Sequence, residues 1–126
     1  MMNRFTHLLL IIAAVVSLTA CGIGSEGYRN VSTEEAKALI DNQEVVVLDV
    51  RTSQEYQEGH IPNAKLIPLQ ELENKLHNLN KDESYLVVCR SGNRSAQASE
   101  ILTGNSFANI YNMTGGMNNW GYEIEN

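Results

Sequence analysis

The chain contains few cysteines and few basic residues. Two cysteines in 126 residues cannot build a disulfide framework or a four-cysteine zinc site. Nine Lys and Arg against 15 Asp and Glu give a formal net charge of −6, which leaves no basic face for nucleic acid. The apolar content of 43% is ordinary and argues against disorder. The sequence therefore indicates one small, acidic, globular domain.

The longest apolar run is short and lies near the N-terminus. Residues 8–16 form nine consecutive apolar residues behind Arg4, whereas a bilayer-spanning helix needs about 20. This pattern is typical of the hydrophobic part of a secretory signal, with a buried core helix as the alternative. Residues 18–21, Leu-Thr-Ala-Cys, resemble the bacterial lipobox. The resemblance implies removal of residues 1–20 and lipidation of Cys21; the alternative is an ordinary secretory signal with a coincidental cysteine.

A lipidated Cys21 would attach the chain to a membrane. Two acyl chains on one cysteine are enough for stable anchoring. Residues 21–29 would then be the lipidated cysteine and a flexible tether, and residues 30–126 the folded domain. We expect an exported bacterial lipoprotein, monomeric, that faces the periplasm or the cell exterior. Cys89 would be its one free thiol in that compartment, which makes a reactive role worth testing.

Strand and helix patterns alternate along the domain. Ser32 with Glu35 and Thr52 with Glu55 match the capping box that begins a helix. Short apolar runs predict strands, and apolar residues spaced by three or four predict helices. The predicted strands are 45–50, 65–68, 85–88 and 109–111, and the predicted helices start after Ser32, span 52–59 and 69–79, and run from 95 to 104. This alternation predicts an α/β fold with a mainly parallel central sheet and helices on both faces.

Cys89 lies where a parallel sheet usually binds ligands. It directly follows the predicted strand 85–88, and the next helix is expected from Ser95. The loop between them can turn its backbone N–H groups inward around an anion. Gly92 and Asn93 are residue types that tolerate the positive φ of such a curl.

Two cations accompany this loop. Arg90 and Arg94 and the start of a helix all favour the thiolate, so we expect a lowered pKa for the Cys89 thiol. A thiolate is the nucleophilic form of cysteine. The alternative, an inert buried cysteine, suits an apolar strand better than a glycine-containing loop with two arginines.

Four ordered motifs resemble those of single-domain rhodaneses, a family of sulfurtransferases. They cover roughly residues 30–122, nearly the whole domain. The motifs are Asp49-Val50-Arg51 with Glu55-Tyr56, Gly59-His60-Ile61-Pro62-Asn63-Ala64, Cys89-Arg90-Ser91-Gly92-Asn93-Arg94-Ser95, and Gly115-Gly116-Met117 with Trp120. The resemblance implies a rhodanese-like domain.

The resemblance also implies a reaction. Cys89 would take a sulfane sulfur from thiosulfate or a persulfide and pass it to a thiol or cyanide, without metal or organic cofactor. The backbone of residues 90–95 would hold the persulfide, and the two arginines would attract the anionic donor. Cysteine phosphatases place an arginine six positions after the cysteine, where Ser95 stands here, so phosphatase or arsenate chemistry is disfavoured. A sulfur carrier or anion-binding module for a partner protein is the second interpretation.

Several nearby residues have supporting roles in this interpretation. Asp49 could orient the Cys89 loop or cap its own loop. Arg51 and Glu55 are expected to pair near the surface. His60 and Trp120 are expected to be structural, because a thiolate that is already formed needs no general base. Asn63 replaces a family glycine and is expected to keep a positive φ.

Overall fold

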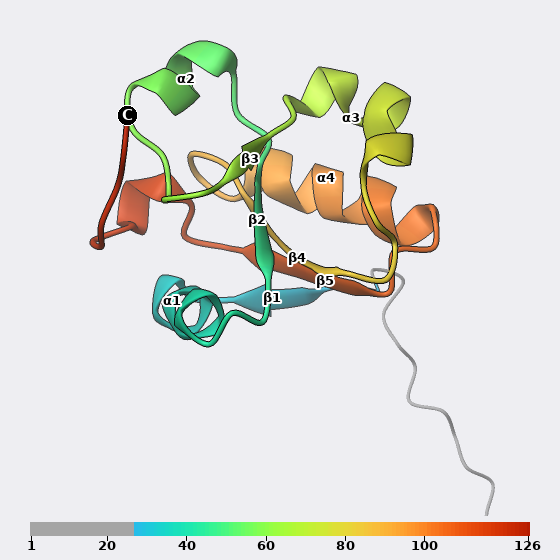
Figure 1. Cartoon of the computed structure of the whole chain (residues 1–126), viewed down its shortest axis with the longest axis horizontal. Helices are drawn as coiled ribbons and strands as arrows, with labels where there is room; N and C mark the ends of the chain where they lie inside the picture. The colour runs from blue at the N-terminus through green and yellow to red at the C-terminus, as the bar shows by residue number, and fades with distance from the viewer. Residues whose placement is uncertain (1–26) are drawn as a thin grey trace, which may run out of the picture.

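The computed structural model describes residues 27–126 and contains one five-stranded sheet (Figure 1). The order is β1-β5-β4-β2-β3, and every neighbouring pair is parallel. The strands are β1 (Arg29–Val31), β2 (Val46–Asp49), β3 (Lys65–Leu66), β4 (Ser84–Val88) and β5 (Asn109–Met113). The predicted α/β class with a parallel central sheet is confirmed.

Helices cover both faces of this sheet. They are α1 (Thr33–Asp41), α2 (Ser53–Gln57), α3 (Leu69–Lys75) and α4 (Asn93–Gly104), with 3-10 turns η1 (Leu76–Asn78) and η2 (Met117–Asn119). One buried cluster joins Leu72 of α3 and Leu102 of α4 to Val87 of β4. The other joins Ala36 of α1 to Leu86. Alternate residues of β4 therefore enter different cores, and the strand is buried on both sides.

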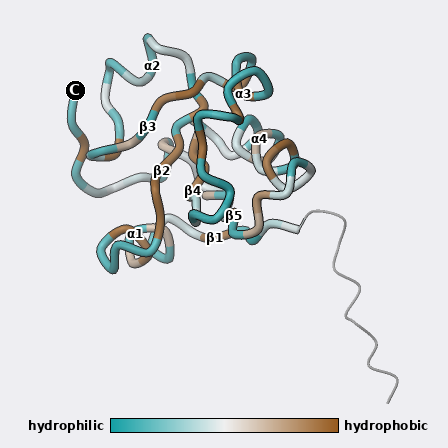
Figure 2. The backbone as a smooth tube through the Cα atoms, turned by 45° about the vertical axis from the view of Figure 1, so that its right-hand side comes forward, coloured by the Kyte–Doolittle hydropathy of each residue, from teal (hydrophilic) through white to brown (hydrophobic). Residues whose placement is uncertain are grey.

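The central strands provide most of the apolar surface. Figure 2 shows β2 as a largely hydrophobic segment, and Leu48 on β2 and Leu86 on β4 are fully buried. The carboxyl ends of these two strands lie side by side, because Asp49 pairs in register with Val88. Residues that follow β2 and β4 are thereby brought to the same edge of the sheet.

The two predicted capping boxes are confirmed and one strand was missed. Ser32 accepts a hydrogen bond from the Glu35 amide at 3.1 Å, and Thr52 accepts one from the Glu55 amide at 3.2 Å, with both capping boxes complete. β1 was not predicted. It begins at Arg29, inside the stretch 21–29 assigned to the tether, and its partner β5 lies about eighty residues later in the chain.

Two helix boundaries differ from prediction. The expected helix 69–79 is split into α3 and the 3-10 turn η1. α4 begins at Asn93, two residues before the predicted start at Ser95, and Gly92, in the left-handed region that glycine tolerates, is its N-cap. Within residues 27–126, no helix has both the length and the apolar character needed to cross a bilayer. The predicted signal segment and Cys21 lie outside the described residues.

Candidate active site

Cys89 lies at the carboxyl edge of the sheet, directly after β4. The chain curls through residues 90–92 and enters α4 at Asn93. The neighbouring strand β2 ends beside it and leads to α2. The site is thus built from the two central strands and the helices that follow them, as expected for an open parallel sheet.

Two amides and one hydroxyl from the loop and from α4 surround the Cys89 sulfur, and the thiol donates to the hydroxyl oxygen. The amides of Gly92 and Ser95 lie 3.1 and 3.3 Å from Sγ, and Ser95 Oγ lies 3.3 Å from it. The residue is only 1% exposed, and Ser95 is fully buried. When the sulfur is ionised, the Ser95 hydroxyl can donate to it. The arrangement is a polar cradle for a sulfur anion, although Cys89 also belongs to the buried apolar cluster on the α4 face of the sheet.

The thiol is acidified by these donors. Burial by itself raises the pKa of the Cys89 thiol, but hydrogen bonds from the Ser95 side chain, the Ser95 amide and the amides of Gly92 and Ser91 outweigh it. The resulting pKa lies below the ordinary value. Of the predicted causes, the amides at the start of α4 and in the loop are found, together with the Ser95 hydroxyl. The two arginines are not among the named causes, and both bind Glu55.

The loop curls at Gly92. Its φ is +101°, and a Cβ there would lie 2.4 Å from the Thr114 carbonyl oxygen, so only glycine fits. Asn93 does not share this conformation, contrary to the sequence interpretation, since it is the first residue of α4. One left-handed residue is enough to turn the amides of Gly92 and Ser95 toward the sulfur.

The outer side of the loop is held by the segment that follows β5. The amide of Met117 donates to the Cys89 carbonyl at 2.8 Å, and that of Asn118 to the Arg90 carbonyl at 3.0 Å. Gly116 has φ +59°, and a Cβ on it would lie 2.3 Å from the Arg90 oxygen. These bonds fix the loop carbonyls outward, which leaves the amides free to face the sulfur. Sequence reasoning found the Gly115-Gly116 motif but missed this contact.

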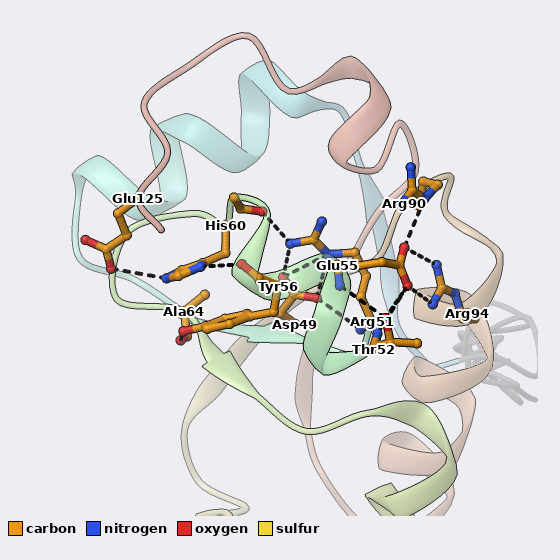
Figure 3. A network of polar contacts seen from close by, with 11 residues as sticks. Asp49, Arg51, Thr52, Glu55, Tyr56, His60, Ala64, Arg90, Arg94 and Glu125 are labelled. Atoms are coloured by element: carbon orange, nitrogen blue, oxygen red, sulfur yellow. Dashed lines mark hydrogen bonds and ion pairs between the residues drawn. The ribbon is translucent and has the colours of Figure 1, made fainter.

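The two loop arginines converge on one carboxylate (Figure 3). Arg94 Nη1 and Nη2 lie 2.7 and 3.0 Å from Oε1 and Oε2 of Glu55, and Arg90 Nε lies 2.9 Å from Oε2. The hydrogen bond from Arg94, opposed by burial and aided by Thr52 and Arg90, holds the pKa of Glu55 well below its usual range. The predicted Arg51–Glu55 pair is therefore wrong: Glu55, on α2, pairs with the Cys89 loop.

Arg51 pairs with Asp49 in the interior. Arg51 Nη2 lies 2.7 Å from Asp49 Oδ2 and 2.8 Å from the Gly59 carbonyl, and the Arg51 amide donates to Asp49 Oδ1 at 3.0 Å. Asp49 is fully buried and Arg51 is 5% exposed. Of the two roles considered for Asp49, the cap of its own loop is found, reinforced by an ion pair. Its side-chain hydrogen bonds go to Arg51, and none of those described reaches the Cys89 loop. Its charge does contribute to raising the pKa of Arg94, after the larger effects of Glu55 and Cys89.

His60 and Trp120 occupy structural positions. His60 is buried, stacks on Tyr56 with ring centroids 3.6 Å apart, and contacts the Tyr56 carbonyl through Nδ1 at 2.8 Å. Trp120 packs against the core on the α1 face. Asn63 has φ +67°, as predicted. In the part of the chain that the structure describes, no group of three or more His, Cys, Asp and Glu could hold a metal ion.

Comparison with known proteins places this chain in a family. Residues 32–123 match the rhodanese-like domain. The thiosulfate sulfurtransferase GlpE of Pseudomonas entomophila is 36% identical over 93 residues, which cover 74% of this chain and 84% of GlpE. YrkF of Bacillus subtilis, named as a candidate sulfur carrier protein, is 35% identical over 71% of this chain; the match spans about half of YrkF.

A solved structure agrees with these matches. A rhodanese-like domain protein from Staphylococcus aureus superposes with a TM-score of 0.71 at 40% identity, covering 77% of this chain and 96% of that protein. The chain belongs to the rhodanese-like domain family, so the predicted resemblance is confirmed. Relatives named as sulfurtransferases support sulfur transfer as the chemistry at the level of the family.

Proposed function

We propose that this protein is a sulfurtransferase that works through a persulfide on Cys89. In the first half-reaction the Cys89 thiolate attacks the sulfane sulfur of a donor. A new S–S bond forms, the donor's S–S bond breaks, and sulfite or a thiolate leaves with the electron pair. In the second, a thiol or cyanide attacks the outer sulfur and the Cys89 thiolate leaves.

The observation that carries this proposal is the cradle around Sγ. Two amides and the Ser95 hydroxyl lie within 3.3 Å of the sulfur. They favour the thiolate needed for attack, and the same curled backbone would stabilise the negative charge of a persulfide. Chemistry of this kind uses side chains and backbone alone.

Intact-mass spectrometry tests the proposal. The protein is treated separately with thiosulfate and with cysteine persulfide, then freed of donor. We expect wild type to gain one sulfur atom with at least one donor, and Cys89→Ser to gain none. No gain on wild type with either donor contradicts the proposal.

A sulfur carrier without turnover of its own is the second candidate, supported by the similarity to YrkF. Both functions begin with the same persulfide, so loading does not separate them. Steady-state transfer to cyanide or a small thiol does. Repeated turnovers support the enzyme, whereas a single release of the loaded sulfur supports the carrier.

We also propose that Cys21 is lipidated and that the domain is exported and membrane-anchored. The support is the lipobox-like sequence before Cys21. Expressed in a bacterium from the full chain, wild type should sediment with membranes, and Cys21→Ala should be released. Cys89→Ala is the matched control and should stay in the membrane fraction. Retention of Cys21→Ala contradicts the proposal.

A further inference from the structure

We infer that Glu55 selects against sulfonate-bearing donors such as thiosulfate, so that the sulfur donor of this site is an organic persulfide. The inference rests on the proposed function and names its substrate class. Glu55 binds both arginines of the Cys89 loop. These are the groups that a thiosulfate dianion would otherwise use.

The contact between Glu55 and Arg94 occupies an anion site. Arg94 Nη1 donates to Glu55 Oε1 at 2.7 Å and Nη2 donates to Oε2 at 3.0 Å. This two-pronged geometry is the one in which a guanidinium binds a carboxylate, phosphate or sulfonate. Glu55 is only 13% exposed. A sulfonate could take this position only by displacing an anion that is already seated there.

Arg90 is held by the same carboxylate. Its Nε lies 2.9 Å from Glu55 Oε2, and its side chain is 53% exposed. Two guanidinium charges, the Glu55 carboxylate and the Cys89 thiolate leave the site formally neutral. Arg51 adds no free charge because Asp49 neutralises it. A dianionic donor therefore meets no net positive charge that would attract it. A persulfide is neutral or singly charged, so its binding depends less on positive charge in the site.

A small cavity beside Arg94 fits the organic part of such a donor. Its volume is about 80 Å³, which exceeds the space of a single water several times. Carbon-rich residues form much of its wall, and Thr52 connects it to Glu55. Besides Arg94 and Thr52, the lining includes Val50, Pro68, Leu69 and the Arg51 side chain, whose charge is paired with Asp49. Thiosulfate has no group for this space, whereas an alkyl persulfide has one.

The resulting step balances without another reagent. The Cys89 thiolate attacks the outer sulfur of R–S–SH, the new S–S bond forms, and R–S⁻ leaves with the electron pair of the broken bond. The proton of the Cys89 persulfide then passes to the released thiolate through solvent. The leaving group carries one negative charge, whereas sulfite would carry two.

The test compares two donors in wild type and Glu55→Gln, which keeps the shape and removes the charge. For wild type we expect kcat/KM to be at least about tenfold higher with cysteine persulfide than with thiosulfate. In Glu55→Gln, kcat/KM for thiosulfate should rise at least about tenfold, and that for cysteine persulfide should change less than about threefold. Sulfate at constant ionic strength should become a stronger competitive inhibitor of the variant.

Glu58→Gln is the matched control, since it removes one exposed acidic charge at the end of the same helix. It should change neither the ratio of kcat/KM for cysteine persulfide to that for thiosulfate nor the inhibition by sulfate. Circular dichroism verifies that both variants are folded.

If Glu55→Gln does not fold, Glu55→Asp provides a second test. Its side chain is too short to reach both arginines, so it should shift the ratio of the two kcat/KM values in the same direction. An unchanged or lower thiosulfate rate with normal persulfide loading overturns this inference alone. Absence of loading by either donor in wild type overturns the proposed function with it.

Discussion

Two clusters of carboxylate and guanidinium groups lie close together at the carboxyl edge of the sheet and differ in burial. Asp49 and Arg51 are almost completely enclosed, with 0% and 5% exposure. Glu55 meets Arg90 and Arg94 at the surface, where the arginine side chains are 53% and 32% exposed. Figure 3 shows both clusters in one view. Similar groups thus serve in two different environments.

The difference in burial gives the two clusters different roles: the buried pair supports the fold, and the exposed cluster affects which donors the site accepts. The inner pair cannot exchange its partners for water or ligand, so each charge depends on the other and on the Gly59 carbonyl. The outer cluster can exchange partners with solvent and with anions. It therefore adds little to stability but controls which charges the Cys89 site presents. This division can be tested by substitutions in each cluster.

Loss of the inner cation should have the largest effect. Arg51→Met leaves the Asp49 carboxylate buried without its counter-charge, and breaking a buried pair in this way costs about 3–5 kcal/mol. We expect the free energy of unfolding to fall by that amount in urea denaturation. Adding Asp49→Asn to Arg51→Met removes the isolated charge and should restore part of the loss. A decrease below about 1 kcal/mol would mean that the inner pair is no more important than a surface pair.

Disturbing the loop backbone should reduce activity while leaving the inner cluster of Asp49 and Arg51 in place. In Gly116→Ala the new Cβ conflicts with the Arg90 carbonyl and the Ser91 amide, so the loop must shift. Misplacement of about 1 Å at a catalytic group can cost about 100-fold, and we expect kcat/KM for sulfur transfer to fall by that order. Gly121→Ala, where a Cβ meets no neighbour, is the control. Equal activities of the two variants would remove the role assigned to the Met117 and Asn118 contacts.

The pKa of the Cys89 thiol should change more on substitution of Ser95 than on substitution in either charged cluster. Ser95→Ala removes the hydrogen bond that lowers the Cys89 pKa most among its donors, so the pKa should rise. One hydrogen bond contributes about 1 kcal/mol, and alkylation by iodoacetamide at pH 7 should slow correspondingly. The pH profile of alkylation measures the shift. Ser99→Ala, one helical turn further and equally buried, should leave it in place. A larger pKa shift in Glu55→Gln than in Ser95→Ala would mean that the outer cluster, and not Ser95, mainly sets the pKa of the thiol.

The features of the fold that could be predicted are local in the sequence. Ser32 and Thr52 begin helices through contacts three residues away, and β2 and β4 are continuous apolar runs. β1 has three residues, two of them exposed, and no such pattern. It is a strand because Asn30 meets Asn112 on β5, and this register depends on the assembled sheet.

The same distinction applies to the candidate site. The Cys89 loop is continuous in the sequence, so its glycine, cysteine and following helix could be found by inspection. The partner of the loop arginines could not, because Glu55 lies 35 and 39 residues before them. The pairing of Arg51 with Glu55 was predicted only from their closeness in the sequence. In the structure Asp49 lies closer to Arg51 and deeper, so it takes the buried guanidinium and Glu55 turns outward.

Neutralising the outer carboxylate should have the smallest effect on stability. Glu55→Gln keeps an oxygen that can accept from the Thr52 amide but loses the charge that binds two partly exposed arginines. Solvent screens such pairs, so we expect the free energy of unfolding at pH 7 to fall by about 0.5–1 kcal/mol. Glu58→Gln, on an exposed residue, should have almost no effect. A loss as large as that of Arg51→Met would contradict the division between the clusters.

The pH dependence of this small difference identifies its origin. The pKa of Glu55 is lowered in the folded state, chiefly by Arg94, so its ionised form stabilises the fold. That contribution is complete above the ordinary glutamate value of 4.5 and is lost as the pH falls toward the folded pKa. Wild type and Glu55→Gln should therefore differ more at pH 7 than at pH 3 in urea denaturation. If the difference in free energy of unfolding between wild type and Glu55→Gln were larger at pH 3 than at pH 7, the carboxylate would not be the stabilising group. The amide of the variant would then disturb packing instead.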